Sequence, residues 1–246
     1  MTGRSASAAM GTDYYVTQKT RLIKDFQDML NGASQFLVPE MGVDRAAKIT
    51  HEALTTFEKL IPNMPDVGGQ QNYIASLIPV AGWYIAFYGP MRANGKKAED
   101  VGRIFYELER REFEAIPPDK RRQMENLYFS EKYIKNMSDF ASWTQRRQFP
   151  ANWVATYLKG DGSFDYGVDY SECALEKYCR REGVPEVAPY ICLSDFLESK
   201  VYNTGLVRTK TLATRDGVCN FRYKKGRLSF QDWGTEIAKI RRVWPK

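Results

Sequence analysis

The stretch WVATYLKGDGSFDYGVDY, residues 153–170, decides the fold class of the C-terminal part of this 246-residue chain. Residues 153–158 alternate between the two faces expected of a strand, and residues 164–170 do so again. Between them, residues 159–163 form a cluster of turn-favouring residues that contains two glycines. The stretch therefore predicts a β-hairpin.

Two helices are predicted after this hairpin. Ser171 is a residue type favoured at an N-cap, so the first helix is expected to start there and to run to about Glu182. Gly183 suits the C-terminal stop of that helix. The second helix is expected from about Pro189 to Tyr202.

A second hairpin is predicted around Asp216-Gly217, a dipeptide favoured in two-residue turns. With such a turn, Thr214 pairs with Cys219, and Leu212 pairs with Phe221. The strands then divide their side chains between the two sides of the sheet. One side receives Arg208, Lys210, Cys219 and Phe221, and the other receives Thr209, Thr211, Asn220 and Arg222.

The order hairpin, two helices, hairpin predicts a four-stranded antiparallel sheet covered by helices on one face, an α+β fold. Residues 13–150 precede the sheet and carry apolar residues at helical spacing, as in Leu22, Phe26 and Leu30. Helices are expected over residues 14–60, 71–87, 97–115 and 119–148, with a loop at residues 62–69 and a stop near Gly89-Pro90.

The chain is expected to form a single domain after a frayed N-terminus. Hydrophobic residues make up 43% and charged residues 27%, which is typical of a globular protein with a buried core. The N-terminal residues 1–12 are small and polar, and residues 13–246 are expected to fold together. Within them, residues 151–228 carry the predicted sheet and two helices, and residues 229–246 form a C-terminal extension.

The charge and apolar patterns restrict the partners. The net charge of +6 is spread along the chain without a run of five or six like charges, so nucleic acid is not an expected partner. A mild positive field favours a small anionic substrate. The longest apolar run, Ile74 to Tyr88, is too short to span a bilayer, and a homo-oligomer is compatible with the sequence.

The histidine and cysteine contents restrict the metal sites and the thiol chemistry that the chain can support. His51 is the single histidine, which excludes a three-histidine zinc site within one chain. The four cysteines have no pair at the two- to four-residue spacing of structural zinc sites, so no metal is expected. Their irregular gaps and the absence of a secretory signal in residues 1–25 favour reduced thiols and a cytoplasmic location.

Cys173 is the first candidate nucleophile. It is expected in the first turn of the helix that begins at Ser171, where free N–H groups and the helix dipole lower the pKa of a thiol. Glu172 would repel the thiolate or accept its proton. A buried structural cysteine is the alternative.

Cys192 and Asp195 form a second candidate pair. They are three residues apart on one expected helix, with Ser199 one turn further on the same face. A thiol, a carboxylate and a hydroxyl in one row could form a reactive strip. The alternative is that Asp195 caps or neutralises the start of this helix.

Arg208 and the aromatic residues of the helical part are candidates for substrate binding. An arginine beside Cys219 suits a carboxylate ligand, because a guanidinium gives paired hydrogen bonds, and a surface arginine is the alternative. Trp83 and Tyr84 could wall an apolar pocket, but their helical spacing suits core packing equally well. Cys179 is expected in the core.

Several of these residues recur in three strings whose order resembles a known family. The strings are FDYGVDYSECALEKY (164–178), APYICLSDF (188–196) and GLVRTKTLATRDGVCNFRYKKG (205–226), preceded by LIPVAGWYIAFYGPMRANGKKAEDVGRIFYE (77–107). Together they resemble the L-2-amino-thiazoline-4-carboxylic acid hydrolase family over roughly residues 75–226. The family commonly has Asp where this chain has Asn220.

The resemblance implies hydrolytic opening of a cyclic amidine-like C–N or C–S bond in a thiazoline carboxylate, without an organic cofactor. Cys192 or Cys173 would then be the nucleophile, unless a carboxylate activates water instead, and Asp195 or Glu172 would move the proton. Arg208 would hold the substrate carboxylate. Further substrate contacts are expected from Thr211, Cys219, Asn220, Trp83 and Tyr84.

Two other hypotheses stay open at this point. One is a cyclase or lyase that acts on a natural-product intermediate in specialised metabolism, with the helical part walling a larger pocket. The other is a non-catalytic module that binds a small molecule on a helix-covered sheet.

Overall fold

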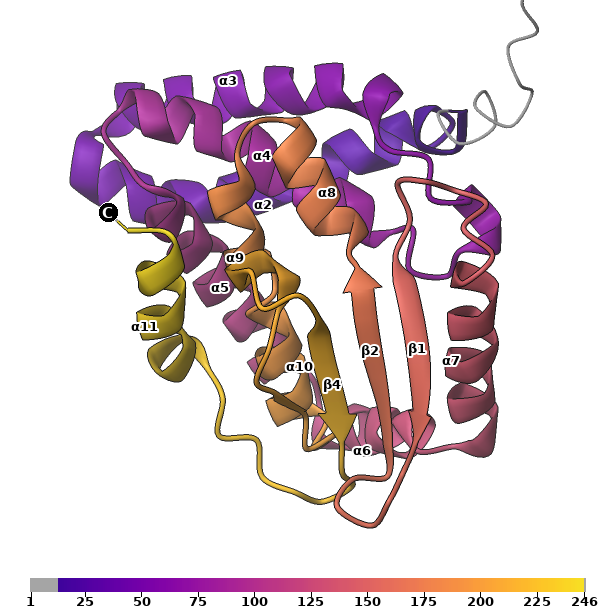
Figure 1. Cartoon of the computed structure of the whole chain (residues 1–246). Helices are drawn as coiled ribbons and strands as arrows, with labels where there is room; N and C mark the ends of the chain where they lie inside the picture. The colour runs from indigo at the N-terminus through magenta and orange to yellow at the C-terminus, as the bar shows by residue number, and fades with distance from the viewer. Residues whose placement is uncertain (1–12, 246) are drawn as a thin grey trace, which may run out of the picture. The chain divides into compact units, whose positions relative to one another are not determined.

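The computed structural model describes residues 13–245, so the expected frayed N-terminus at residues 1–12 lies outside the described range. Helices come first along the chain, and a four-stranded antiparallel sheet follows in the C-terminal part (Figure 1). This confirms the α+β class.

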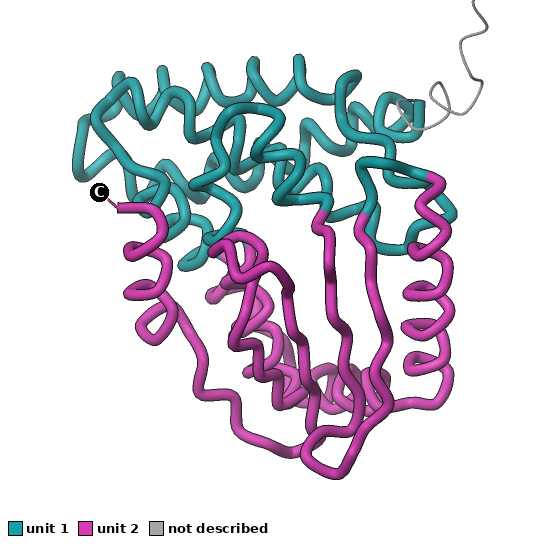
Figure 2. The backbone as a smooth tube through the Cα atoms, in the orientation of Figure 1, with its two compact units in different colours: residues 1–108, 149–152, 174–191 teal, residues 109–148, 153–173, 192–246 magenta. Residues whose placement is uncertain are grey.

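The chain forms two compact units, each built from three stretches of sequence (Figure 2). Unit 1 consists of residues 1–108, 149–152 and 174–191, and unit 2 consists of residues 109–148, 153–173 and 192–246. These boundaries differ from the segments expected from the sequence. One helical stretch of the N-terminal part belongs with the sheet, and one stretch from between the two hairpins belongs with the N-terminal helices.

Unit 1 is helical in its described part. Its helices are α2 (Lys19–Met41), α3 (Val43–Leu60), α4 (Leu77–Ala93), the first part of α5 (Ala98–Glu114), α8 (Ala174–Arg181) and α9 (Ala188–Ile191), with short 3-10 helices at Ile61–Asn63, Gly69–Gln71 and Pro185–Val187. The predicted apolar row of Leu22, Phe26 and Leu30 is buried. The expected helical stretch is divided at Gly42, whose φ of 82° breaks the helix.

Helix α4 does not stop at Gly89-Pro90 as predicted. It continues to Ala93, with Pro90 inside it. A proline has no N–H to donate, which would normally weaken the helix there. The carbonyl of Pro90 accepts a hydrogen bond from the Asn94 side chain at 2.9 Å, which helps to close the last turn. The helix also starts later than expected, at Leu77.

Unit 2 contains the sheet and the remaining helices. These elements are α6 (Pro118–Tyr128), α7 (Glu131–Thr144), β1 (Val154–Lys159), β2 (Tyr166–Glu172), α10 (Ser194–Val201), β3 (Val207–Arg208), a 3-10 helix at Leu212–Thr214, β4 (Cys219–Tyr223) and α11 (Trp233–Val243). The single helix expected over residues 119–148 is two helices, because Ser130 caps α7 by accepting a hydrogen bond from the Tyr133 N–H.

The strand order is β1-β2-β4-β3, and every neighbouring pair is antiparallel. The first hairpin is confirmed as the β1–β2 pair. Tyr166 of β2 lies opposite Tyr223 of β4, and their rings stack with centroids 4.8 Å apart. Paired residues share a side of the sheet, so one mainly aromatic side can be listed from the register. It carries Tyr166, Val168, Tyr170, Arg208, Cys219, Phe221 and Tyr223.

The predicted register of the second hairpin is wrong. Phe221 pairs with Arg208 instead of Leu212, and a ten-residue loop replaces the two-residue turn. The side chain of Asn220 accepts the N–H groups of Thr209 and Lys210, so these backbone groups bond a side chain instead of a strand. The register differs by four residues, an even number, so Arg208 and Phe221 still share a side as predicted.

Side chains bind the backbone at both outer strands of the sheet. At β3, the amide of Gln231 accepts from the Arg208 N–H at 2.8 Å and donates to the Arg208 carbonyl at 2.7 Å. At β1, the Ala155 N–H donates to Thr144 Oγ1 at 2.9 Å, and the Ala155 carbonyl accepts from Gln145 at 2.7 Å.

A search of residues 13–245 for a membrane-crossing helix finds none with the required length and apolar character.

Candidate active site

Cys192 lies in a break between helices. The sequence predicts one helix over residues 189–202, but α9 ends at Ile191 and α10 begins at Ser194. The Phe196 N–H bonds to the Leu193 carbonyl at 3.2 Å, while the Cys192 carbonyl accepts from Arg208 Nη2 at 2.9 Å. The expectation that Cys192 and Asp195 share one continuous helix is therefore wrong, since the guanidinium takes the carbonyl that a helix would use.

Arg208 nevertheless connects these two residues. Its Nη1 donates to Asp195 Oδ2 in an ion pair, and its Nη2 binds the Cys192 carbonyl. The guanidinium also lies over the rings of Phe196 and Phe221, at 4.6 and 5.0 Å from their centroids. The Arg208 side chain is 3% exposed and that of Asp195 is 35% exposed. The side chain of Asp195 is thus the more exposed member of the pair.

Burial governs the protonation of this group of side chains. It raises the pKa of the Cys192 thiol, and the opposing charge of Arg208 is the smaller effect. At neutral pH the thiol is therefore protonated. Burial also raises the pKa of Asp195, against the charge and hydrogen bond of Arg208, which stabilise the carboxylate.

Thr211 and Cys219 hold the loop that joins β3 to β4. The Cys219 sulfur accepts from the Leu212 N–H at 3.2 Å and donates to Thr211 Oγ1 at 3.5 Å. Burial raises the pKa of this thiol too, so it is neutral at neutral pH. These contacts tie Thr211 and Cys219 to the shape of the loop.

Asn220 also holds the loop between β3 and β4 in shape. Its Oδ1 accepts from the N–H groups of Thr209 and Lys210 at 3.0 and 2.7 Å, and its Nδ2 donates to Thr209 Oγ1 at 2.9 Å. An aspartate could accept the same two backbone N–H groups. The observed bonds therefore require an oxygen acceptor at this position and do not require a negative charge.

The predicted start of the helix at Ser171 is wrong. Ser171 and Glu172 end strand β2, and α8 begins at Ala174, so Cys173 precedes the helix instead of lying in its first turn. The Ser171 hydroxyl donates to the Val154 carbonyl at 3.4 Å, across the β1–β2 pair, and does not cap α8. Glu172 forms an ion pair with Arg147.

Trp83 and Tyr84 lie in α4 of unit 1. The Tyr84 ring packs edge-on against Phe105, with centroids 4.5 Å apart, and Tyr84 is buried. The Trp83 ring stacks on Phe26, with centroids 5.9 Å apart. These contacts are those of core packing, the alternative that the helical spacing left open.

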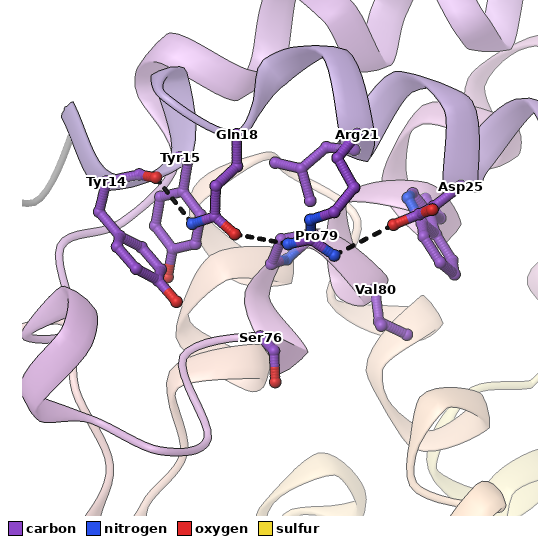
Figure 3. Close-up of a pocket in the computed structure, with 10 residues that line it drawn as sticks. Tyr14, Tyr15, Gln18, Arg21, Asp25, Ser76, Pro79 and Val80 are labelled. Carbon is purple, nitrogen blue, oxygen red and sulfur yellow. Dashed lines mark hydrogen bonds and ion pairs between the residues drawn. The ribbon is translucent and has the colours of Figure 1, made fainter.

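Trp83 also borders a small pocket in unit 1 of about 100 Å³ (Figure 3). Its lining comes from the start of the described chain, α2 and α4: Tyr14, Tyr15, Gln18, Arg21, Leu22, Asp25, Ser76, Pro79, Val80 and Trp83. Figure 3 shows that Arg21 donates to Gln18 and Asp25, while Gln18 donates to the Tyr14 carbonyl. The charges and amides that border the pocket are thus bonded to one another, and its lining contains no thiol.

Two further carboxyl groups of unit 2 interact electrostatically with Asp195, and neither was predicted from the sequence as a site residue. Glu198 lies three residues after Asp195 in α10 and accepts a hydrogen bond from the Tyr128 hydroxyl. Glu109 lies in α5, and burial raises its pKa to about 8, with smaller contributions from the charges of Glu112, Asp195 and Glu198. Glu109 directly follows the apolar Leu108 in the helix expected over residues 97–115, and a carboxyl beside an apolar residue was the available signal.

Among residues 13–245 no group of three or more His, Cys, Asp and Glu side chains is arranged to hold a metal ion.

Comparison with known proteins places the chain in one family. The chain matches no curated protein and no solved structure. A family model described as L-2-amino-thiazoline-4-carboxylic acid hydrolase matches residues 81–223, which is more than half of the chain and includes Glu109, Cys192, Asp195 and Arg208. The protein therefore belongs to the L-2-amino-thiazoline-4-carboxylic acid hydrolase family.

Proposed function

We propose that this protein is a hydrolase that opens a small cyclic amidine, a thiazoline carboxylate or a related ring, at a C–N or C–S bond. Membership of the family supports the reaction class and the ring. The observation that carries the choice of residues is the ion pair between Asp195 and Arg208, with Cys192 bound to the same guanidinium. No organic cofactor is needed for the steps below.

In this proposal Asp195 is the general base. Its side chain is partly exposed, and Arg208 orients the carboxylate and stabilises its ionised form against the effect of burial. A water molecule attacks the amidine carbon while Asp195 takes its proton, and the leaving sulfur or nitrogen later receives that proton. General-base catalysis of this kind typically contributes 10²–10⁴-fold to a rate.

Arg208 acts through Asp195 as a positioning residue. The sequence suggested that it holds the substrate carboxylate, but its guanidinium is nearly fully buried and already bonded to Asp195 and Cys192. A lysine would present one compact ammonium in place of the planar fork whose two nitrogens make these two bonds.

The neutral thiols favour activated water over a thiolate nucleophile. Burial raises the pKa of Cys192 and of Cys219, so each thiol would have to lose its proton at an energetic cost before attacking. For Asp195, by contrast, the charge and hydrogen bond of Arg208 stabilise the ionised form, which is the form that acts as a base.

The experiment measures turnover of L-2-amino-thiazoline-4-carboxylate by the full chain. Asp195→Asn is expected to lower kcat by about 100-fold or more, because the amide cannot accept the proton. Cys192→Ser, with Cys179→Ser as the matched control, is expected to keep kcat within about tenfold, far less than the loss from a missing base.

Three results would contradict parts of the proposal. No turnover by the wild type rejects the substrate. Near-normal turnover by Asp195→Asn rejects Asp195 as the base. A large loss in Cys192→Ser, with a modest one in Asp195→Asn, would favour the thiolate mechanism.

A further inference from the structure

Glu109 differs from the other buried carboxyl groups of unit 2 in its hydrogen bonding. Asp195 is paired with Arg208, and Glu198 accepts from the Tyr128 hydroxyl. One oxygen of Glu109, Oε2, is buried and has no hydrogen-bond partner within residues 13–245. A buried polar atom without a partner is rare and destabilising, so this one needs an explanation.

The charges around Glu109 help to determine whether its carboxyl group is protonated at neutral pH. Glu112 faces it from the same helix, and Asp195 and Glu198 face it from α10. Burial is the largest effect, these three negative charges add to it, and together they raise the pKa of Glu109 to about 8. At neutral pH Glu109 is therefore a neutral carboxylic acid, and it lies near Asp195, whose ionised form Arg208 stabilises.

Two carboxyl groups in different electrostatic environments are a common arrangement for an acid and a base in one site. Arg208 stabilises the ionised form of Asp195, whereas the main charges that act on Glu109 among the described residues are the three negative ones named above. A substrate with a basic nitrogen would supply the missing partner for Glu109. The ring nitrogen of a cyclic amidine is such a group, since its lone pair accepts a proton.

We propose that Glu109 is a further catalytic residue, the acid that protonates the ring nitrogen of the amidine substrate. This inference rests on the proposed function. Its geometric basis is the buried, unpartnered Oε2 of Glu109 and its position near Asp195 and Glu198.

The proton transfers balance over one turnover. The Glu109 O–H bond breaks as the N–H bond forms, which leaves Glu109 ionised and makes the amidine carbon more electrophilic. Water then forms a C–O bond to that carbon and gives one proton to Asp195. When the C–S or C–N bond breaks, its electron pair goes to the leaving atom, which takes the proton from Asp195. The new hydroxyl loses its proton to Glu109 as the carbonyl forms, so both residues return to their starting states.

The test compares Glu109→Gln with Glu112→Gln in the full chain, with L-2-amino-thiazoline-4-carboxylate as substrate. Glu109→Gln keeps the size of the side chain but has no acidic proton, so kcat is expected to fall by about 100-fold or more. KM should change little. The wild type should lose activity on the alkaline side with a pKa of about 8, and that limb should be absent from the residual activity of Glu109→Gln.

Glu112→Gln is the matched control, because it removes a charge that faces Glu109 and leaves the acid itself in place. Removing a nearby negative charge lowers the pKa of a carboxyl group. The alkaline limb should therefore move to lower pH, while kcat below the limb is unchanged. If Glu109→Gln fails to fold, this shift decides the question alone, and an unmoved limb overturns the role of Glu109.

The two proposals fail in different ways. Wild-type turnover with normal kcat and an unchanged alkaline limb in Glu109→Gln overturns the role of Glu109 and leaves Asp195 as the base. Absence of wild-type turnover overturns the proposed function and, with it, this inference.

Discussion

Asp216 organises the loop between β3 and β4 through one carboxylate oxygen. Its Oδ2 accepts from the Thr211 N–H, the Thr214 hydroxyl and the Lys239 ammonium, at 2.7–2.9 Å. Burial alone would raise the pKa of Asp216, but these hydrogen bonds and the charge of Lys239 outweigh it and lower the pKa. The folded state thus favours the ionised form.

Stability should therefore depend on the ionisation of Asp216. A carboxyl whose pKa is depressed by folding stabilises the protein above its unfolded pKa of about 3.9, and this stabilisation is lost as the pH falls through the folded pKa. Asp216→Asn is expected to lower the free energy of unfolding by about 1–2 kcal/mol at pH 7. The difference from wild type should shrink below about pH 4.

The measurement is urea unfolding of both proteins at several pH values. Asp139→Asn is the control, since Asp139 is exposed and paired only with Lys135 one turn away on α7, among the described residues. Such a surface pair contributes at most about 0.5 kcal/mol. A difference for Asp216→Asn that persists unchanged at low pH would contradict the assignment.

At the scale of single residues, the sequence identifies several members of the candidate site by their residue type and position. Cys192, Asp195 and Arg208 were each recognised as candidates, and the structure brings them together through one guanidinium. Glu109 was not predicted as a site residue, because a glutamate beside apolar residues of a helix is usually a solvated side chain. Its environment depends on α10, which lies about ninety residues further along the chain.

At the scale of elements, Gly102 controls how closely α5 approaches Tyr190. A Cβ atom at position 102 would lie 2.5–2.6 Å from three atoms of Tyr190, which is buried. Gly102→Ala is therefore expected to destabilise the protein by about 1–3 kcal/mol, because overpacking outweighs the gain in helix propensity.

Gly89 of α4 provides the matched control for this prediction. Apart from its two chain neighbours, a Cβ atom at Gly89 would meet nothing within 4 Å, but Pro90 follows it in the helix. The clash of a Cβ with the following proline ring offsets the gain in helix propensity, so Gly89→Ala should change the free energy of unfolding by less than about 1 kcal/mol. Denaturant unfolding of both variants gives the comparison. Equal effects of the same sign would show that contact with Tyr190 does not set the requirement for glycine.

Element boundaries were predictable where the interactions are local. The hairpin at residues 153–170 was predicted from alternation and its turn residues, and both of its strands form as expected. The helix expected over residues 189–202 is broken because Arg208, distant in sequence, binds the Cys192 carbonyl. The register of the second hairpin was wrong because Asn220 bonds the backbone that would otherwise continue the ladder.

At the scale of the whole molecule, the chain passes between the two units at five points, after residues 108, 148, 152, 173 and 191. Neither unit is therefore one continuous stretch. Alternation and helical spacing report local structure, so they predict the elements and leave the grouping of distant segments undetermined.

This discontinuity predicts that residues 13–108 will not fold as a stable fragment. They lack α8 and α9, and α4, which is apolar around most of its surface, packs against both of these helices. The fragment should show no cooperative thermal transition by circular dichroism. A chain that starts at residue 13 and keeps residues 13–246 is the control, because it retains every contact described. A cooperative transition of the fragment at the same Tm would contradict the prediction.

The side chains that bind the outer strands have a consequence for self-association. An incoming strand from another molecule would need the backbone N–H and carbonyl of Arg208 on β3, yet Gln231 already occupies both. At Ala155 on β1, Thr144 and Gln145 occupy the equivalent groups. Growth of a shared sheet from one molecule to the next is therefore obstructed at Arg208 on one outer strand and at Ala155 on the other, which disfavours a homo-oligomer built by strand addition at these positions.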